Sequence, residues 1–234
     1  MATKPSIYIL HGWTQDITKW ELCVNLLKSA GYKVKLLTIP GLTEKLDKPW
    51  NLDNYVQWFK HQVADDRKIL VVAHSFGGRV AIRFDVKNPN VIQKLVLIDS
   101  AGIRPRTYSA IVKRMSFKAL AKIGKRITQN PKARKVLYQL AGERDYYKAN
   151  TVLAQTMSNI VEEDQQAEIP FVKAHTLILW GSHDTITPLS DGRLMSKMIT
   201  GSTMKIINDA KHSPHYTHPE EVVDHILKFF PQHQ

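Results

Sequence analysis

Residues 68–86 read Lys-Ile-Leu-Val-Val-Ala-His-Ser-Phe-Gly-Gly-Arg-Val-Ala-Ile-Arg-Phe-Asp-Val. The first six residues are almost wholly apolar, which is typical of a strand that is covered on both faces. Small residues then flank Ser75, and apolar residues recur at helical spacing after it. The segment therefore predicts a buried strand, a sharp turn at Ser75 and a helix over 76–86.

Strand-like and helical segments alternate on both sides of this turn. The predicted strands cover residues 6–10, 32–39, 68–73, 93–98, 175–180 and 204–208. The predicted helices cover residues 18–30, 51–64, 76–86, a segment after Pro188, and 219–230. Because parallel strands are usually joined by helices, this alternation predicts an α/β fold with a doubly wound, mostly parallel sheet.

Residues 103–168 interrupt the alternation. They contain no convincing strand and are punctuated by Gly124, Pro131 and Gly142. We therefore predict one structural unit in two parts. Residues 1–102 and 169–234 form the core, and residues 103–168 form an inserted, basic helical cap, or lid.

The chain of 234 residues has 33 Lys and Arg against 21 Asp and Glu, a net charge of +12. Residues 104–148 hold thirteen of the bases and only two acids, so the excess lies in the predicted cap. Three interpretations are open: a solvated surface, a field that attracts acidic substrates, or a peripheral dock for anionic membranes or nucleic acid. The sequence contains no specific nucleic-acid-binding module beside this charge. We therefore favour the solvated surface.

The composition, 43% hydrophobic and 23% charged, excludes a disordered chain, collagen and a coiled coil. No apolar run reaches the roughly 18 to 20 residues of a transmembrane segment. Residues 1–5 lead directly into a predicted strand rather than a signal peptide. Cys23 is the only cysteine, so no internal disulfide forms. We therefore expect a cytoplasmic protein.

Ser75 has the features of a catalytic nucleophile. A sharp turn from strand to helix, known as a nucleophile elbow, strains the serine backbone and lifts Oγ above the edge of the sheet. Such a turn leaves room only for small residues two positions away, and Ala73 and Gly77 meet this requirement. The motif therefore predicts a serine that attacks its substrate directly.

A serine hydroxyl needs a base to accept its proton and an acid to orient that base. Asp184 follows the strand predicted at 175–180, and His212 follows the strand predicted at 204–208. The carboxyl ends of parallel strands lie along one edge of the sheet, so both side chains can meet Ser75 there. The order Ser, Asp, His is that of the alpha/beta hydrolases.

Other residues compete for two of these roles. His215 and His218 lie near His212 in the sequence, but in the lead-in to the final helix rather than at a strand exit, so we favour His212 as the base. Asp99 also ends a strand. We favour Asp184 as the acid, because its strand is adjacent to the one that precedes the base, and we expect Asp99 to bind loop amides.

Acyl transfer also requires N–H donors for the developing oxyanion. We predict an oxyanion hole made by the backbone N–H of Phe76, directly after the nucleophile, and the backbone N–H of Trp13, in the loop after the first strand. Gly12 allows this loop to turn, and we expect His11 to hold it through hydrogen bonds. His74 is most simply a buried histidine in a polar niche.

The sequence resembles the alpha/beta-hydrolase superfamily, specifically its lid-bearing serine hydrolases of the esterase, carbon-carbon hydrolase and proline-iminopeptidase-like groups. The matching residues are 9–13, 73–78, 179–188, 210–212 and 218–221. In that family these positions supply the oxyanion loop, the nucleophile, the acid and the base. The resemblance implies an alpha/beta-hydrolase sheet trimmed to about six strands from the usual eight.

We therefore expect a serine hydrolase, a carboxylesterase, that cleaves a carboxylic ester or related acyl bond through an acyl-enzyme at Ser75. The expected partner is a small acyl substrate, and no cofactor or metal is expected. One alternative is a non-catalytic ligand-binding or scaffold protein that docks anionic partners on its basic cap. Another is a carbon-carbon bond hydrolase, peptidase or acyltransferase with the same triad. A serine at this position argues against dehalogenase and epoxide hydrolase chemistry, which use an aspartate.

Overall fold

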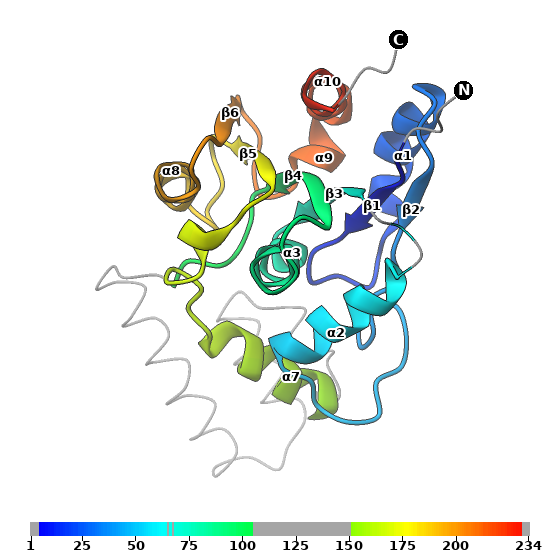
Figure 1. The fold of residues 1–234 in the computed structure, drawn as a ribbon, viewed down its shortest axis with the longest axis vertical. Coiled ribbons are helices and arrows are strands. Elements are labelled where there is room, and N and C mark those ends of the chain that lie inside the picture. Colours follow the sequence, from blue (N-terminus) through cyan, green and yellow to red (C-terminus); the bar gives the residue numbers. More distant parts are fainter. Residues whose placement is uncertain (1–4, 65, 67, 105–150, 231–234) are drawn as a thin grey trace, which may run out of the picture.

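The computed structural model describes residues 5–64, 66, 68–104 and 151–230 (Figure 1). Its centre is a sheet of six strands: β1 (Ile7–Leu10), β2 (Val34–Leu36), β3 (Ile69–His74), β4 (Ile92–Ile98), β5 (His175–Gly181) and β6 (Thr203–Ile207). The strands lie in the order β2-β1-β3-β4-β5-β6, and all neighbouring pairs are parallel. The predicted parallel sheet of about six strands is confirmed.

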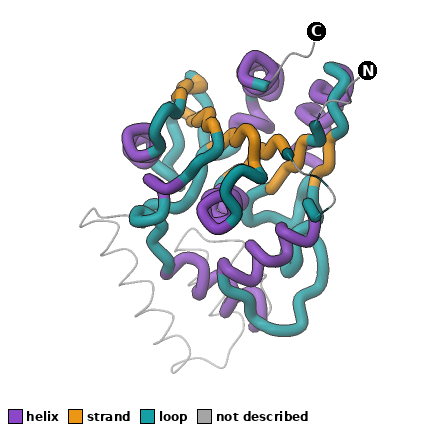
Figure 2. The backbone as a smooth tube through the Cα atoms, in the orientation of Figure 1, coloured by secondary structure: helices purple, strands orange, loops and turns teal. Residues whose placement is uncertain are grey.

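Helices cover both faces of this sheet (Figure 2). One face carries α1 (Glu21–Ser29) and α10 (Pro219–Phe229), and the other carries α2 (Leu52–Gln62), α3 (Phe76–Lys87) and α8 (Leu189–Met198). Shorter elements are the 3-10 turns η1 (Thr18–Trp20) and η2 (Ile169–Phe171) and the helix α9 (Pro214–Thr217). The sheet is therefore doubly wound, as predicted.

The side chains of β3 divide between two hydrophobic clusters. Ile69, Val71 and Ala73 pack with residues of α2 and α3, whereas Leu70 and Val72 pack with residues of α1 and α10. All five side chains are fully buried. This alternation explains the nearly continuous apolar run in the sequence, because both faces of a central parallel strand are covered by helices.

Some predicted boundaries were wrong. The second strand, predicted over 32–39, is only the three residues Val34–Leu36. Among the described strands it lies at the edge of the sheet and pairs with β1 alone, and the chain then turns away at Pro40, which forms an isolated bridge with Glu44. The helix predicted over 18–30 begins instead with the 3-10 turn η1. The short helix α9 was not predicted.

Most of the predicted cap, residues 105–150, lies outside the described residues, so the division into core and cap stays a prediction. The chain re-enters the described part as α7 (Thr151–Glu162). Two hydrogen bonds fix α7 to the backbone of Trp50: Thr156 Oγ1 accepts from its N–H at 3.1 Å, and Asn159 Nδ2 donates to its carbonyl at 3.2 Å. Among the helices that the structure describes, none combines the length and apolarity needed to cross a bilayer.

Candidate active site

Ser75 occupies the turn between β3 and α3 with a backbone conformation of φ +50° and ψ −113°, which residues with a side chain rarely adopt. Three backbone hydrogen bonds hold this turn. The N–H of Ser75 donates to the carbonyl of Ile98 at 3.1 Å, and its carbonyl accepts from Gly78 N at 3.0 Å and from Ala101 N at 3.1 Å. The end of β4 therefore supports the strained turn.

Close backbone packing explains the glycines around Ser75. A Cβ atom on Gly77 would lie 2.1 Å from the carbonyl oxygen of Leu10, at the end of β1. A Cβ atom on Gly12 would lie 2.7 Å from Nδ1 of His74. The first turn of α3 and the loop after β1 can therefore approach the serine only because both positions lack a side chain.

The structure brings the three residues predicted as a triad within hydrogen-bond distance of one another. His212 Nε2 lies 2.9 Å from Ser75 Oγ, and His212 Nδ1 lies 2.8 Å from Asp184 Oδ2. An ionised carboxylate only accepts, so Nδ1 carries the imidazole proton and Nε2 is free to accept the serine proton. The arrangement can deprotonate Ser75, which is the requirement for a serine nucleophile.

Asp184 is held as an anion by a full set of donors. Its side chain is completely buried, with 0% exposure, whereas that of His212 is 16% exposed. Oδ1 accepts from the backbone N–H groups of Ile186 at 2.7 Å and Thr187 at 3.0 Å, and Oδ2 accepts from Thr187 Oγ1 at 2.7 Å. Burial acts to raise the pKa of Asp184, but the hydrogen bonds from His212, Thr187 and Ile186 outweigh it and lower the pKa.

The contacts of Thr187 with the carboxylate of Asp184 were not predicted from the sequence. The available signal was the spacing, because an aspartate commonly accepts from backbone N–H groups two and three residues later in a turn. The additional hydroxyl contact depends on the conformation of the whole loop after β5.

Two further histidines, His74 and His11, form hydrogen bonds in the segments around the serine. His74 Nε2 donates to the backbone carbonyl of His212 at 2.7 Å. Burial, followed by the neighbouring His215 and His212, holds the pKa of His74 well below its usual value, so it is a neutral donor. It is buried as expected, but its support of the His212 backbone was not predicted. The expected hydrogen bond of the preceding loop is present, since His11 Nδ1 lies 2.7 Å from Gly12 O.

The geometry does not favour the rival bases. His215 lies in α9 and stacks on Trp20, with ring centroids 4.1 Å apart and planes at 16°. Burial lowers the pKa of His215 to about 3. His218 is partly buried at the start of α10, and its Nδ1 lies 2.8 Å from Thr217 Oγ1. Of the three candidates, His212 is the one that the structure places against the serine hydroxyl.

Asp99 binds a backbone N–H at the end of strand β5 rather than the loop amides expected of it. Its Oδ1 accepts from the backbone N–H of Gly181 at 2.8 Å, which ties the end of β4 to the end of β5. Burial raises the pKa of Asp99 to about 8, so the carboxyl group is mainly protonated at neutral pH. A neutral acid cannot supply the negative charge that the imidazolium needs, which favours Asp184 in that role.

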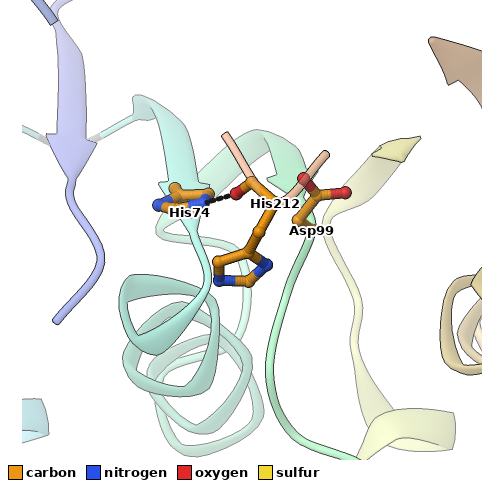
Figure 3. Close-up of side chains that lie close together, drawn as sticks. All are labelled: His74, Asp99 and His212. Atoms are coloured by element: carbon orange, nitrogen blue, oxygen red, sulfur yellow. Dashed lines mark hydrogen bonds between the residues drawn. The ribbon is translucent and has the colours of Figure 1, made fainter. Parts of the chain in front are cut away.

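His74, Asp99 and His212 offer potential metal-ligand atoms within 4.8 Å of one another (Figure 3). The hydrogen bonds already described occupy most of these atoms. Both ring nitrogens of His212 are engaged, by Asp184 and by Ser75, and His74 Nε2 is engaged by the His212 carbonyl. A metal ion would have to break at least one of these bonds, so we assign the group to the hydrogen-bonded site and no metal to it.

The two predicted oxyanion donors belong to adjacent segments. The N–H of Phe76 is in the first turn of α3, where N–H groups lack helical partners. The Trp13 ring meets the Phe76 ring edge to face, with centroids 5.3 Å apart and planes at 78°. The ring of Tyr55 packs on the Phe76 ring at 5.0 Å, and the ring of Trp50 packs on that of Tyr55 at 4.9 Å. The assignment of these N–H groups to an oxyanion hole stays a prediction.

Comparisons with known proteins agree with this architecture. The model of the alpha/beta hydrolase family matches residues 7–225. The pimeloyl-[acyl-carrier protein] methyl ester esterase of Vibrio vulnificus (strain CMCP6) is 24% identical over 248 residues, covering 96% of this chain and 94% of that protein. The 2-hydroxy-6-oxononadienedioate/2-hydroxy-6-oxononatrienedioate hydrolase of Escherichia coli (strain K12) is also 24% identical, with coverage of 96% and 86%. The structure of an enol-lactonase from Burkholderia xenovorans superposes with a TM-score of 0.72 at 19% identity, covering 97% of this chain and 92% of that one.

Proposed function

Because the chain belongs to the alpha/beta hydrolase family, we propose that it is a serine hydrolase that cleaves a carboxylic ester or a related acyl bond. The observation that carries this proposal is the continuous hydrogen-bonded chain from Ser75 Oγ through His212 to Asp184, with links of 2.9 and 2.8 Å. The strained backbone of Ser75 supports it, because such strain is concentrated at functional sites.

In the first half of the reaction, Ser75 Oγ attacks the carbonyl carbon of the substrate while His212 Nε2 accepts the hydroxyl proton. The carbonyl oxygen becomes an oxyanion, which the N–H groups of Phe76 and Trp13 stabilise. When the tetrahedral intermediate collapses, the bond to the leaving group breaks and His212 returns the proton to it. The product of this half is an acyl ester on Ser75, together with the released alcohol.

In the second half, water attacks the acyl carbon and His212 Nε2 accepts a proton from that water. Collapse of the new intermediate breaks the bond to Ser75 Oγ, which takes the proton back from His212, and the carboxylic acid leaves. Asp184 stays ionised throughout. It fixes the proton on Nδ1 and stabilises the imidazolium that forms in each half.

A fluorophosphonate probe tests this proposal directly, because it reacts with an activated serine. We expect stoichiometric labelling of the wild-type chain at Ser75, turnover of p-nitrophenyl esters, and loss of both in Ser75→Ala. Ser29→Ala, at the exposed end of α1, is the matched control and should behave like the wild type. Near-normal ester hydrolysis by Ser75→Ala would refute the assignment of the nucleophile.

The same experiment separates the alternatives. A scaffold protein on a hydrolase framework would show no labelling and no turnover, with salt-sensitive binding to anionic vesicles or nucleic acid. A carbon-carbon bond hydrolase, peptidase or acyltransferase would be labelled at Ser75 but would release different products, so mass spectrometry of the products identifies it. Profiling p-nitrophenyl esters by chain length then defines the acyl group.

We also propose, as an alternative to a purely solvated surface, that the basic charge of residues 104–148 selects an anionic acyl substrate. Thirteen bases and two acids in this segment create a field that raises the local concentration of negative ligands. Such attraction is screened by salt. We expect kcat/KM for a carboxylate-bearing ester to fall as the ionic strength rises, whereas that for a neutral ester of equal length stays constant. Equal salt dependence for both esters would show that the segment does not select substrate charge.

A further inference from the structure

Thr187 brings a hydroxyl group to the bond between the proposed acid and base. It lies in the loop between β5 and α8, three residues after Asp184. Thr187 Oγ1 is 2.7 Å from Asp184 Oδ2 and 3.2 Å from His212 Nδ1. It is also 3.1 Å from the backbone carbonyl of Asp99, at the end of β4. One hydroxyl therefore contacts both partners of the Asp184–His212 pair.

The Thr187 hydroxyl can donate only one hydrogen bond, so its acceptor must be determined. Thr187 Oγ1 has one proton, and two acceptors, Asp184 Oδ2 and the Asp99 carbonyl, lie within reach. The ionised carboxylate is the stronger acceptor and also the nearer one. We propose that Thr187 donates its hydroxyl proton to Asp184 and is a positioning residue for the Asp184–His212 pair.

The rest of Thr187 is held independently of its hydroxyl. Its N–H donates to the other carboxylate oxygen, Asp184 Oδ1, at 3.0 Å. Its carbonyl accepts from Nε1 of the buried Trp180 at 2.9 Å. A change that removes only the hydroxyl therefore leaves the loop anchored, and its effect reports on the contact with the pair.

This contact has two consequences for the reaction. The hydroxyl limits the orientations of the carboxylate, so its loss loosens the alignment of His212 with Ser75 and lowers kcat. The hydroxyl also withdraws charge from Oδ2. Without it, Oδ2 carries more negative charge and attracts the Nδ1 proton of His212 more strongly, so the hydrogen bond between the two groups changes. Of these two consequences, only the lower kcat rests on the proposed function.

The test compares Thr187→Val, which keeps the shape but loses the hydroxyl, with Thr187→Ser, which keeps the hydroxyl. With a p-nitrophenyl ester between pH 5 and 9, we expect the valine variant to lose about 5- to 10-fold in kcat with little change in KM. Thr187→Ser should restore kcat. Thr185→Val, at an exposed position in the same loop, should match the wild type.

A measurement without substrate separates this inference from the proposed function. The proton between His212 Nδ1 and Asp184 gives a downfield ¹H NMR signal, which is assigned by its loss in His212→Gln. We expect this signal to shift in Thr187→Val and to remain unshifted in Thr187→Ser. Near-ultraviolet circular dichroism verifies the fold of each variant, and Thr187→Ala replaces the valine variant if that variant is unfolded.

The outcomes are distinct. A wild-type chain that hydrolyses no ester but shows the signal and its shift would refute the proposed function and leave the positioning role intact. An active wild type, together with unchanged kinetics and an unchanged NMR signal in Thr187→Val, would refute the positioning role and leave the proposed function intact.

Discussion

At the scale of single residues, Asp184 is the buried anion of the site. Its two oxygens receive donors from the loop and from His212, and the side chain has no exposure to solvent. A buried charge is tolerated only when it is paired and fully hydrogen-bonded. The loop after β5 therefore satisfies this carboxylate from several sides at once.

Replacing Asp184 by asparagine tests this role. The amide keeps the shape of the side chain but can present an N–H group to His212 Nδ1, which favours the tautomer that cannot accept from Ser75. We expect kcat for a p-nitrophenyl ester to fall by about four orders of magnitude, as such a change does in serine proteases. Asp209→Asn, an exposed acid after β6, is the control and should retain full activity. A loss of less than tenfold in Asp184→Asn would contradict the assignment.

The proximity of Ser75, Asp184 and His212 could be predicted because each follows a recognisable strand, and parallel strands end along one edge. Neither the role of Thr187 nor the hydrogen bond from His74 to the His212 carbonyl was predicted. The contacts of Thr187 with Asp184 lie within one loop, and their spacing was overlooked. The approach of Thr187 to His212 and the hydrogen bond from His74 depend on how segments distant in the chain fold against each other, which no local spacing encodes. The composition of a strand end predicts where a side chain lies, but not which of its neighbours donates to it.

At the scale of the elements, the approach of α3 to β1 determines where the serine lies. The first turn of the helix passes so close to the end of β1 that Gly77 has no room for a side chain. The same turn contains the N–H of Phe76, so the serine and one predicted oxyanion donor share a single rigid unit. A displacement of this helix would move both groups together.

Gly77→Ala is therefore expected to impair both stability and catalysis. Its Cβ atom would meet the Leu10 carbonyl at 2.1 Å, and since that oxygen belongs to the backbone, the helix must move away. We expect the free energy of unfolding to fall by about 1–3 kcal/mol, which is typical of overpacking, and kcat to fall more than tenfold. Urea denaturation and ester kinetics measure the two effects. Wild-type values in both experiments would show that α3 can move without affecting the serine.

Element boundaries were predicted well where burial is complete and poorly at the edge. The fully buried β3 was predicted over 68–73 and lies at Ile69–His74. The edge strand β2 was predicted to be far longer than it is, because its apolar residues continue after its pairing ends. The hydrophobic pattern records which residues are buried, whereas the length of an edge strand depends on its one neighbour.

At the scale of the whole molecule, buried ionisable groups determine how stability depends on pH. Burial raises the pKa of Asp99 to about 8 and lowers that of His215 to about 3, and it also lowers the pKa of His74. The stability from Asp99 is complete below its unfolded pKa of about 4 and is lost as the pH rises through 8. The stability from the two histidines is complete above their unfolded pKa of about 6.5 and is lost as the pH falls below it, down to about 3 for His215.

These opposing contributions predict a maximum of stability near pH 6.5. Of these three groups, the two histidines outweigh the carboxyl group of Asp99 below that pH, and above it only Asp99 still changes the stability. We expect the urea midpoint to fall on both sides of the maximum. In Asp99→Asn, which can still accept from Gly181 N, the fall between pH 6.5 and 8 should disappear. A fall of the same size in this variant would show that Asp99 is not its source.

Ser75, Asp184 and His212 follow β3, β5 and β6, so the residue proposed as the nucleophile is synthesised long before its proposed acid and base. During translation the serine leaves the ribosome first and the histidine last. Under the proposed function, a fragment that ends before β6 contains Ser75 without the base that would deprotonate it. Such a fragment should be hydrolytically inactive, and activity should arise only once β6 and the loop after it have folded onto the sheet.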